Sequence, residues 1–324
     1  MKDTYELKHK VALLNPYGSV VQVLDGDPDQ ILTGIKNTAS IPNTLMHKLE
    51  KHGFCLHTID KKSQLAGRAV DTQLINPISG RIMSGSSSGT AINVFAGIND
   101  LGIGSDGGGS VLAPAISVNI LGFISKLIEQ DQIKASGKPN TDGMKATFSL
   151  GFMARKREIL LKAINDSIGI TAGNSYGLVL SDKQYPGIDS KVIEVMDALS
   201  PRQELVPYLQ QKLSECDVMI VTEGPIDLDG FGDSLFGHFD ARTKKIQERS
   251  MKGYVRVCNI AGATALAIPQ SGLGMATLLM CQSKPEKIAC LLKAAEAIPD
   301  VHDELIERYF LNLNNYFLDG YHID

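Results

Sequence analysis

Two short segments of this chain are too apolar for a sheet that has one face in water. They are "DVMIVTEGP" (Asp217 to Pro225) and "TALAIP" (Thr264 to Pro269), and neither alternates polar with apolar residues along its strand-like core. Strands of this kind are buried on both faces. Between such segments lie amphipathic patterns, as at Met153 to Ser167, where Ile159, Leu160, Ala163 and Ile164 share one helical face. The sequence therefore predicts an α/β fold whose sheet is covered on both faces.

Further elements follow from the same reasoning. "VVQVLD" (Val20 to Asp25) reads as a strand because β-branched residues alternate in it, and "TLMHKLEKHG" (Thr44 to Gly53) reads as an amphipathic helix closed by a glycine. Residues 128–145 are polar and interrupted by Gly-Lys-Pro, so we expect the least order there.

Charge and composition narrow the class of partner. The chain has 324 residues, 43% of them apolar, and its 32 Lys plus Arg against 36 Asp plus Glu give a net charge of -4. This balance creates no field that would recruit nucleic acid or an anionic membrane. The charged first ten residues do not fit a signal peptide, and no stretch reaches the roughly 18 apolar residues of a membrane span. We expect a cytoplasmic protein with a small-molecule partner.

The sequence contains no recognisable motif for binding a metal or a cofactor. The five cysteines are widely spread and form no CxxC pair, which suggests reduced thiols rather than zinc ligands or a disulfide framework. The seven histidines form no H-E-x-x-H and no cluster with carboxylates. We therefore expect no metal and no cofactor.

The stretch from Ser84 to Ala115 holds two glycine-serine clusters, "SGSSSG" and "GSDGGGS". Either cluster alone is typical of a surface loop. Gly102, Gly104 and Gly107 also satisfy G-x-G-x-x-G, the dinucleotide-binding pattern, but Pro114 and the neighbouring glycines disfavour the helix that this pattern needs. A third interpretation joins the clusters, because consecutive glycine N–H groups can surround an oxyanion beside a nucleophilic serine.

Both clusters resemble the amidase signature family, whose hallmark is G-G-S-S-G-G-S followed by an alanine-rich helix and G-T-D-x-G-G-S-I-R-x-P. "SGSSSGTAINVFAG" is similar to the first part and "GSDGGGSVLAP" to the second, and Ser110 follows Ser86 by 24 residues, as in the family. "INP" (Ile75 to Pro77), "FSLGFMARKREILLKAI" and "NIAGATALAIP" resemble other family blocks. The resemblance implies one compact amidase-signature-like domain over residues 1–324, with a signature core at about 76–126 and a large mixed sheet covered by helices on both faces.

The resemblance also assigns site residues. It implies that Ser110 is the nucleophile and that Ser86, which in the family follows a cis peptide, relays a proton. The N–H groups of Gly107, Gly108 and Gly109, together with that of Ser110, would form an oxyanion hole. Ser105 and Asp106 would hold this loop in shape.

The family's third catalytic residue, a buried neutral lysine, has no clear counterpart. Aligning "NPYGSVVQVLD" with the family's strand puts Leu24 at the lysine position. Aligning "LTGIKN" instead makes Lys36 the base, although it precedes Ser86 by only 50 residues, fewer than in the family. "TGIK" also resembles a T-x-G-S-K stretch that follows the family's lysine. Leu24 and Lys36 stay open as alternatives. If Lys36 is not the base, we expect it to be a solvated surface residue, as most lysines are.

These residues support an amidase-signature-type hydrolase or amidotransferase that acts on a small amide through a serine acyl-enzyme. The alternative is a catalytically impaired, amidase-like binding or scaffold protein that lacks the family's lysine; a nucleotide-binding protein is a third hypothesis.

Some residues depart from the signature, namely Leu112, Ser84, Ser88 and Thr90. The segment from Thr222 to Asp240 is interpreted either as an ordinary loop or as a substrate-facing one. A homodimer is compatible with the resemblance. The acyl and amine groups of the substrate, and hydrolysis against transfer, stay undetermined.

Overall fold

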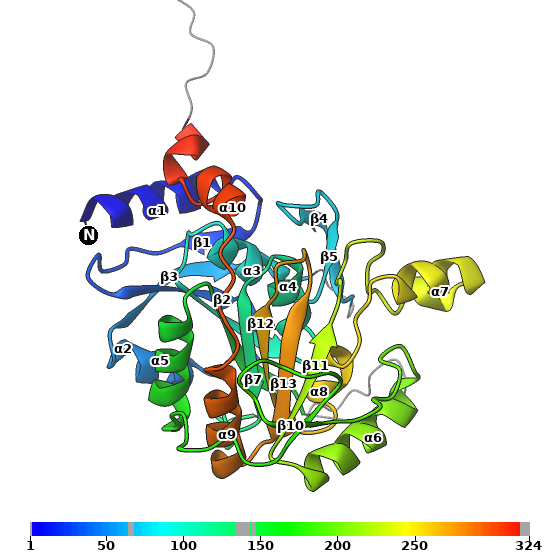
Figure 1. The fold of residues 1–324 in the computed structure, drawn as a ribbon. Coiled ribbons are helices and arrows are strands. Elements are labelled where there is room, and N and C mark those ends of the chain that lie inside the picture. Colours follow the sequence, from blue (N-terminus) through cyan, green and yellow to red (C-terminus); the bar gives the residue numbers. More distant parts are fainter. Residues whose placement is uncertain (1, 64–67, 134–142, 144–146, 318–324) are drawn as a thin grey trace, which may run out of the picture.

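An 11-stranded mixed sheet runs through the centre of the computed structural model, which describes residues 2–63, 68–133, 143 and 147–317 (Figure 1). In spatial order its strands are β1 (Val20–Val23), β3 (Phe54–Asp60), β2 (Ile31–Lys36), β6 (Leu101–Asp106), β8 (Ser149–Ala154), β7 (Leu121–Ser125), β12 (Ala263–Pro269), β13 (Ala276–Gln282), β11 (Val218–Glu223), β9 (Val179–Ser181) and β10 (Ser190–Val192). Strands β4 (Val70–Ile75) and β5 (Ile82–Ser84) form a separate antiparallel pair.

The sheet combines parallel and antiparallel pairing. β3, β2 and β6 run parallel to one another, as do β11, β9 and β10, whereas β6, β8, β7, β12, β13 and β11 pair antiparallel in succession. This arrangement confirms the predicted large mixed sheet. Most of the polar stretch 128–145 lies outside the described residues.

Burial explains why the most apolar segments lie at the centre. β12 buries every residue except Pro269, and β11 buries every residue except Thr222. A strand with both faces in the core gains apolar burial from each successive side chain, so it needs no polar alternation. The two segments from which the fold class was predicted are therefore interior strands.

Helices cover one face of the sheet around the two signature clusters. They are α3 (Ser88–Phe95), α4 (Leu112–Ser117), α6 (Arg202–Glu215) and α8 (Val255–Cys258). Side chains from all four join one apolar cluster with Leu278 and Met280 of β13. Every residue of α3 and α4 is buried, so both helices lie inside the protein.

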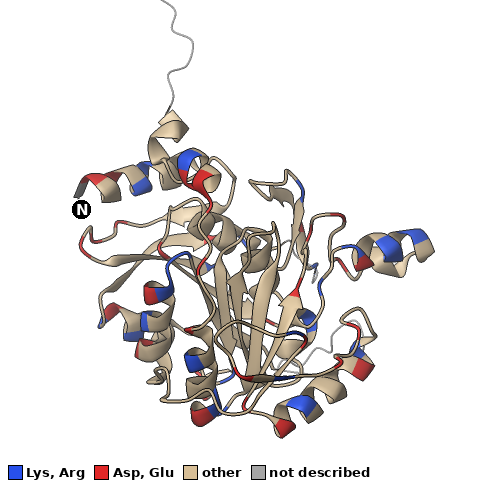
Figure 2. Cartoon of the chain, in the orientation of Figure 1, with Lys and Arg blue, Asp and Glu red and all other residues tan. Residues whose placement is uncertain are grey.

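The opposite face carries α2 (Asn43–Glu50), α5 (Arg157–Ile168) and α9 (Pro285–Ala295). Leu160, Ala163 and Ile164 of α5 are buried in a second apolar cluster, and Ile159 packs partly against it. The predicted apolar face of this helix is confirmed. The sheet is thus covered on both sides, and Figure 2 shows the charged residues mainly on these outer helices and loops.

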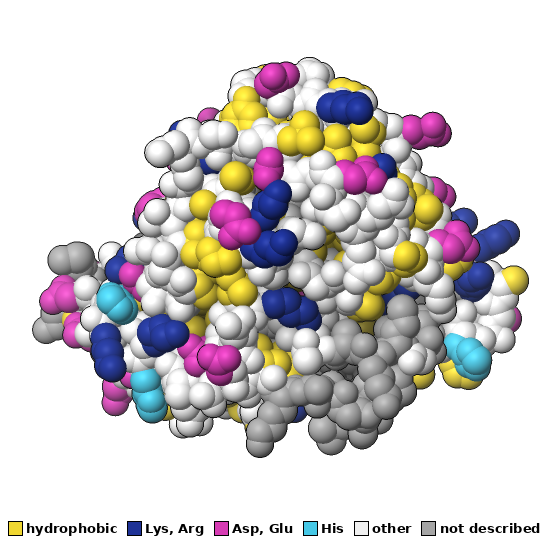
Figure 3. Space-filling view, turned by 90° about the horizontal axis from the view of Figure 1, so that it is seen from below, with side chains coloured by type: hydrophobic (Ala, Val, Ile, Leu, Met, Phe, Trp, Pro, Cys, Tyr) yellow, Lys and Arg dark blue, Asp and Glu magenta, His cyan; other side chains and the backbone are white. Residues whose placement is uncertain are grey.

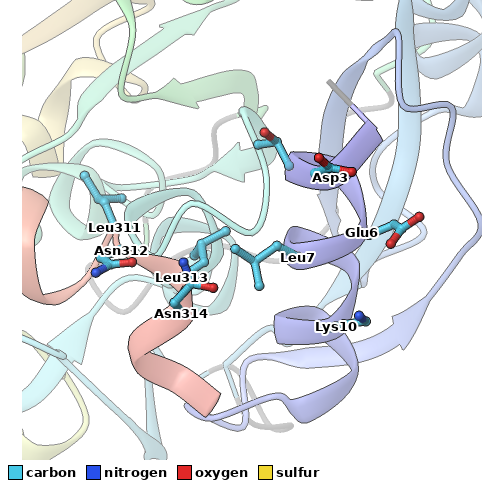
Figure 4. A pocket seen from close by; sticks show the side chains of 9 residues that line it. Asp3, Glu6, Leu7, Lys10, Leu311, Asn312, Leu313 and Asn314 are labelled. Atoms are coloured by element: carbon cyan, nitrogen blue, oxygen red, sulfur yellow. The ribbon is translucent and has the colours of Figure 1, made fainter. Parts of the chain in front are cut away.

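The remaining elements lie at the periphery. They are α1 (Lys2–Leu14), η1 (Phe236–His238), α7 (Ala241–Glu248), α10 (Glu304–Tyr309) and η2 (Leu313–Phe317). Leu7 of α1 points toward Leu313 across a shallow pocket between the two ends of the chain (Figure 4). The face in Figure 3 mixes acidic and basic side chains, so no single sign of charge covers it. None of the described helices is long and apolar enough to cross a membrane.

The glycines of "GIGSDG" allow close packing between β6 and α3. A Cβ on Gly102 would lie 2.6 Å from Thr90 Cγ2 and 2.9 Å from Val94 Cγ2, and a Cβ on Gly104 would lie 2.8 Å from Ser87 Oγ. These contacts are with the preceding helix, whereas a dinucleotide fingerprint opens the helix that follows its strand. Packing of α3 on β6 therefore accounts for the first two glycines of the G-x-G-x-x-G pattern.

Replacing Gly102 by Ala tests this packing. We expect Gly102→Ala to lower the free energy of unfolding by about 1–3 kcal/mol, because the new methyl group overlaps two β-branched side chains. Gly107→Ala is the matched control, since a Cβ there meets nothing within 4 Å. Urea unfolding of the two variants would measure the difference, and equal midpoints would contradict the packing role.

Candidate active site

Parallel pairing of β2 and β6 brings the ends of two strands together. Thr33 pairs with Leu101 and Ile35 with Ile103, so the carboxyl ends of both strands reach the same edge of the sheet. Lys36 is the last residue of β2, and Asp106 is the last residue of β6. Polar groups that are 70 residues apart in the sequence thereby become neighbours.

Lys36 lies at the centre of this edge and points at Ser86. Its Nζ donates to Ser86 Oγ at 2.6 Å, to Ser105 Oγ at 3.0 Å and to the Ser105 carbonyl oxygen at 3.2 Å. Only 5% of Lys36 is exposed to solvent. Three short contacts fix the amine in position, and all three partners belong to the two signature clusters.

Burial gives the Lys36 amine an unusual proton affinity. Loss of solvation lowers its pKa from the ordinary 10.5 to about 7; the Asp106 carboxylate opposes this effect, and the Lys62 cation adds to it. A large fraction of Lys36 is therefore neutral near neutral pH. A neutral amine at hydrogen-bonding distance from a serine hydroxyl can accept its proton.

Leu24 lies away from Ser86, so of the two residues that the sequence alignments offered, Lys36 is the one that contacts it. β1, the strand before Leu24, lies at the edge of the sheet and pairs antiparallel with β3. Its carboxyl end therefore points away from the end of β2, where Ser86 lies.

Ser86 and Ser110 come from adjacent loops. A Cβ on Gly85 would lie 3.4 Å from Ser110 Cα, and the Ser87 N–H donates to the Ser110 carbonyl oxygen at 3.2 Å. Both serine side chains are partly exposed. Ser110 Oγ has no hydrogen-bond partner in the described part of the chain, so it is free to meet a ligand.

The backbone before Ser86 differs from the cis geometry that the resemblance implied. Among the described residues the recorded cis peptide is Gly224–Pro225, so the bond between Gly85 and Ser86 is trans. Gly85 instead takes φ +112°, which non-glycine residues rarely adopt. The sharp turn into Ser86 is therefore made at the Cα of Gly85.

Asp106 organises the loop between β6 and α4. Its Oδ1 accepts from the Gly109 N–H at 2.7 Å, and its Oδ2 accepts from the N–H of Val111 at 2.7 Å and of Leu112 at 3.4 Å. The buried carboxylate thus satisfies three backbone donors, each charge-assisted. It forces the chain to turn back on itself around Ser110.

This arrangement corrects one expected oxyanion-hole donor. The Gly109 N–H was expected to face a ligand, but it points inward to Asp106. The N–H groups of Gly107, Gly108 and Ser110 make no hydrogen bond to any described residue, and Gly107 is exposed. The Gly109 N–H turned inward because the buried Asp106 carboxylate accepts it.

A side chain that the sequence analysis did not single out closes the loop from the other side. Asn259 Nδ2 donates to the carbonyl oxygens of Gly107 and Thr147, each at 3.0 Å, and its Oδ1 accepts from Ser149 Oγ and Lys126 Nζ. Burial lowers the pKa of Lys126 to about 8. Asn259 opens the "NIAG" motif, so its place in that motif was the available signal.

The acidic loop after β11 also reaches this region. Asp227 accepts hydrogen bonds from the Ser84 hydroxyl and from its N–H, and the Ser84 hydroxyl in turn accepts from the Gly232 N–H. Ser84 stands where the signature has glycine, so this departure has a structural purpose. It anchors the loop beside the first glycine-serine cluster, two residues before Ser86.

These groups come together at one edge of the sheet. Lys36 contacts Ser86, the loop of Ser86 adjoins that of Ser110, and the N–H groups of Gly107, Gly108 and Ser110 have no partners among the described residues. No group of three or more His, Cys, Asp or Glu side chains in the described residues could hold a metal ion. Such an arrangement can activate a serine hydroxyl and stabilise an oxyanion on a carbonyl that it attacks.

Comparisons with known proteins found relatives that match parts of this chain. The chain matches no protein-family model. It is 35% identical over 92 residues to the A subunit of glutamyl-tRNA(Gln) amidotransferase from Methanothermobacter thermautotrophicus, covering 26% of this chain and 20% of the relative. It is 30% identical over 142 residues to the corresponding protein of Sulfurisphaera tokodaii, covering 38% and 30%. The matches thus span less than a third of these two curated relatives.

A solved structure shows the same fold over nearly the whole chain. The A subunit of glutamyl-tRNA(Gln) amidotransferase from Thermotoga maritima superimposes with a TM-score of 0.63 at 14% identity, covering 92% of each chain. At that identity the likeness concerns the fold, and it includes the mixed sheet and the helices on both faces.

The pKa of Lys36 predicts how stability depends on pH. Between about pH 7 and the ordinary pKa of 10.5, the unfolded chain holds a proton on Lys36 that the folded protein has released. Raising the pH through this window therefore raises the free energy of unfolding. Lys36→Met cannot titrate, so its stability should gain less than that of wild type. Urea unfolding at several pH values would measure this, and parallel curves would contradict the lowered pKa.

Proposed function

We propose that this chain, an amidase-signature-like protein, cleaves or transfers small amides through an acyl-enzyme on Ser110. Residues 1–324 would act as one catalytic unit with the signature core at about 76–126. The single observation that supports this best is the 2.6 Å hydrogen bond from Lys36 Nζ to Ser86 Oγ, made by an amine whose pKa is about 7. A buried lysine whose pKa is strongly perturbed is typical of a functional site, and here it contacts a serine whose loop adjoins that of Ser110.

In the proposed reaction the neutral Lys36 amine accepts the Ser86 hydroxyl proton while Ser86 accepts that of Ser110. Ser110 Oγ attacks the amide carbonyl carbon, and the N–H groups of Gly107, Gly108 and Ser110 receive the developing oxyanion. Collapse of the intermediate breaks the C–N bond, and the proton returns through Ser86 to the departing amine. Water or another amine then attacks the ester and releases Ser110 by the same route.

Asp106 and Ser105 would act by positioning. Asp106 holds the backbone so that the Gly107, Gly108 and Ser110 N–H groups face one way, and Ser105 supplies two of the three acceptors of Lys36. Neither would contact the substrate. Removing either would misplace the groups that do.

The alternative of a binding or scaffold protein rested on a missing base. The contact between Lys36 and Ser86 supports Lys36 as a candidate for that base, and no observation favours the alternative. The curated relatives are components of amidotransferases, whereas this chain matches only 20% and 30% of their lengths. Our proposal is therefore limited to a small amide as substrate; transfer against hydrolysis, a homodimer and a cytoplasmic location stay predictions.

An active-site label tests the nucleophile and the base. A fluorophosphonate forms a covalent bond with an activated serine, and intact-mass measurement detects the adduct. We expect one adduct on wild type, none on Ser110→Ala, and a labelling rate about 10²–10⁴-fold lower for Lys36→Met, the usual contribution of a general base. The matched control is Lys244→Met on α7, whose side chain is 66% exposed.

Circular dichroism would establish that each variant is folded. Labelling of Ser110→Ala at the wild-type rate would refute the nucleophile. Labelling of Lys36→Met at the wild-type rate would refute the base, while the absence of any adduct on folded wild type would favour the scaffold alternative.

The labelling rate should also depend on pH. Only neutral Lys36 accepts a proton, so the wild-type rate should rise with pH and reach half its maximum near pH 7, where the Lys36 amine loses its proton. Lys36→Met should show no such midpoint. A wild-type rate that is flat from pH 6 to pH 9 would contradict the assignment.

A further inference from the structure

A second buried lysine, Lys252, lies beside the Ser110 loop. The segment that carries it is fixed by Glu223 at the end of β11, whose carboxylate accepts from the N–H groups of Gly253 at 2.5 Å and Tyr254 at 2.9 Å. The carbonyl oxygen of Val255 would lie 3.2 Å from a Cβ on Gly109. Backbone contacts therefore hold this segment against the loop that ends at Ser110.

The Lys252 side chain runs between two glycines toward this loop. Its Cδ lies 2.5 Å from where a Cβ on Gly232 would be, and its Cε lies 3.5 Å from where a Cβ on Gly109 would be. Any side chain at Gly232 would displace the lysine stem. The ammonium group, one bond beyond Cε, is a close neighbour of the residue that precedes Ser110.

Lys252 has no partner in the described part of the protein. It is only 8% exposed, yet its ammonium donates no hydrogen bond to a described residue and has no carboxylate within 4 Å. A buried cation without a partner is costly, and proteins usually pair it. Lys36 differs in this respect, because all its contacts are made within the protein.

The surrounding charges leave Lys252 available to an anion. The carboxylates of Asp227 and Asp106 attract it, and the guanidinium groups of Arg202 and Arg256 repel it. Asp227 is occupied by Ser84, and Asp106 by the backbone of the loop. Burial lowers the pKa of Lys252, and a bound anion would restore its charged form.

We propose that Lys252 binds a carboxylate of the substrate, so that the preferred substrates are small amides that carry a carboxylate a few bonds from the scissile carbonyl. This inference rests on the proposed function, because it places the carboxylate relative to an amide held at Ser110. A single ammonium matches a single negative charge. Lys252 Cε lies close to Gly109, the residue before Ser110. One small molecule can therefore place its carboxylate at Lys252 and its amide at Ser110.

Matched substrate pairs provide the test. The monoamides malonamate, succinamate and glutaramate carry one carboxylate, and the diamides malonamide, succinamide and glutaramide replace that carboxylate by an uncharged group of equal shape. Ammonia release gives kcat/KM for each. For at least one chain length we expect wild type to prefer the monoamide by about 10–100-fold, the usual effect of one hydrogen bond to a charged group.

Variants of Lys252 assign this preference to its charge. Lys252→Met should reduce the monoamide-to-diamide ratio to near one, and Lys252→Arg, which keeps the charge, should retain part of it. Lys244→Met on α7 is the matched surface control and should leave the ratio unchanged. A wild-type ratio near one at all three lengths, or the same ratio in wild type and Lys252→Met, would overturn the inference. A uniform loss of both rates would instead make Lys252 an oxyanion-stabilising residue and would also overturn it.

Two further measurements separate this inference from the proposed function. Calorimetric binding of the three monoamides to Ser110→Ala requires no turnover, so tight binding that is lost in Ser110→Ala/Lys252→Met would support the carboxylate site even if no amide were cleaved. Equal binding by both variants would refute it, even if wild type cleaved amides.

Thermal unfolding provides a second check. Replacing a buried amine that has no partner by an apolar side chain should raise the Tm of Lys252→Met, whereas a lower Tm would show that the protein itself supplies the partner and would overturn the inference.

Discussion

The hydrogen bond from Lys36 to Ser86 depends on the register between β2 and β6. Both strands end at the same edge of the sheet because they run parallel with Thr33 opposite Leu101. A shift of one residue would turn Lys36 to the other face of the sheet, since successive side chains alternate. The contact between Lys36 and Ser86 therefore depends on apolar packing that is remote from it, because the apolar clusters fix the register.

The conformation of the loop around Ser110 depends on two buried side chains. Asp106 binds three of its backbone N–H groups from inside the protein, and Asn259 binds a carbonyl oxygen from the other side. The remaining donors, those of Gly107, Gly108 and Ser110, have no partner among the described residues. Such donors are effective because they are fixed before a ligand arrives and need no reorganisation during the reaction.

The two buried lysines near this turn show how burial serves different purposes. Lys36 is surrounded by acceptors, so the loss of solvation affects mainly its proton affinity. Lys252 is equally shielded from water but has no such acceptors among the described residues. A cost in folding free energy at Lys252 becomes binding free energy when an anion supplies the missing partner.

The sequence by itself determined the α/β class, the interior strands and the segments that carry Ser86 and Ser110, because apolar runs and short glycine-serine motifs are local patterns. It could not choose between Leu24 and Lys36, since that choice depends on which strand lies beside β6. Nor could it show that the Gly109 N–H turns inward or that Lys252 reaches the loop, because Asp106, Glu223 and Gly232 act across the fold. Strand order, register and the direction of each backbone group arise only when distant segments pack together, so the tertiary structure alone decided them.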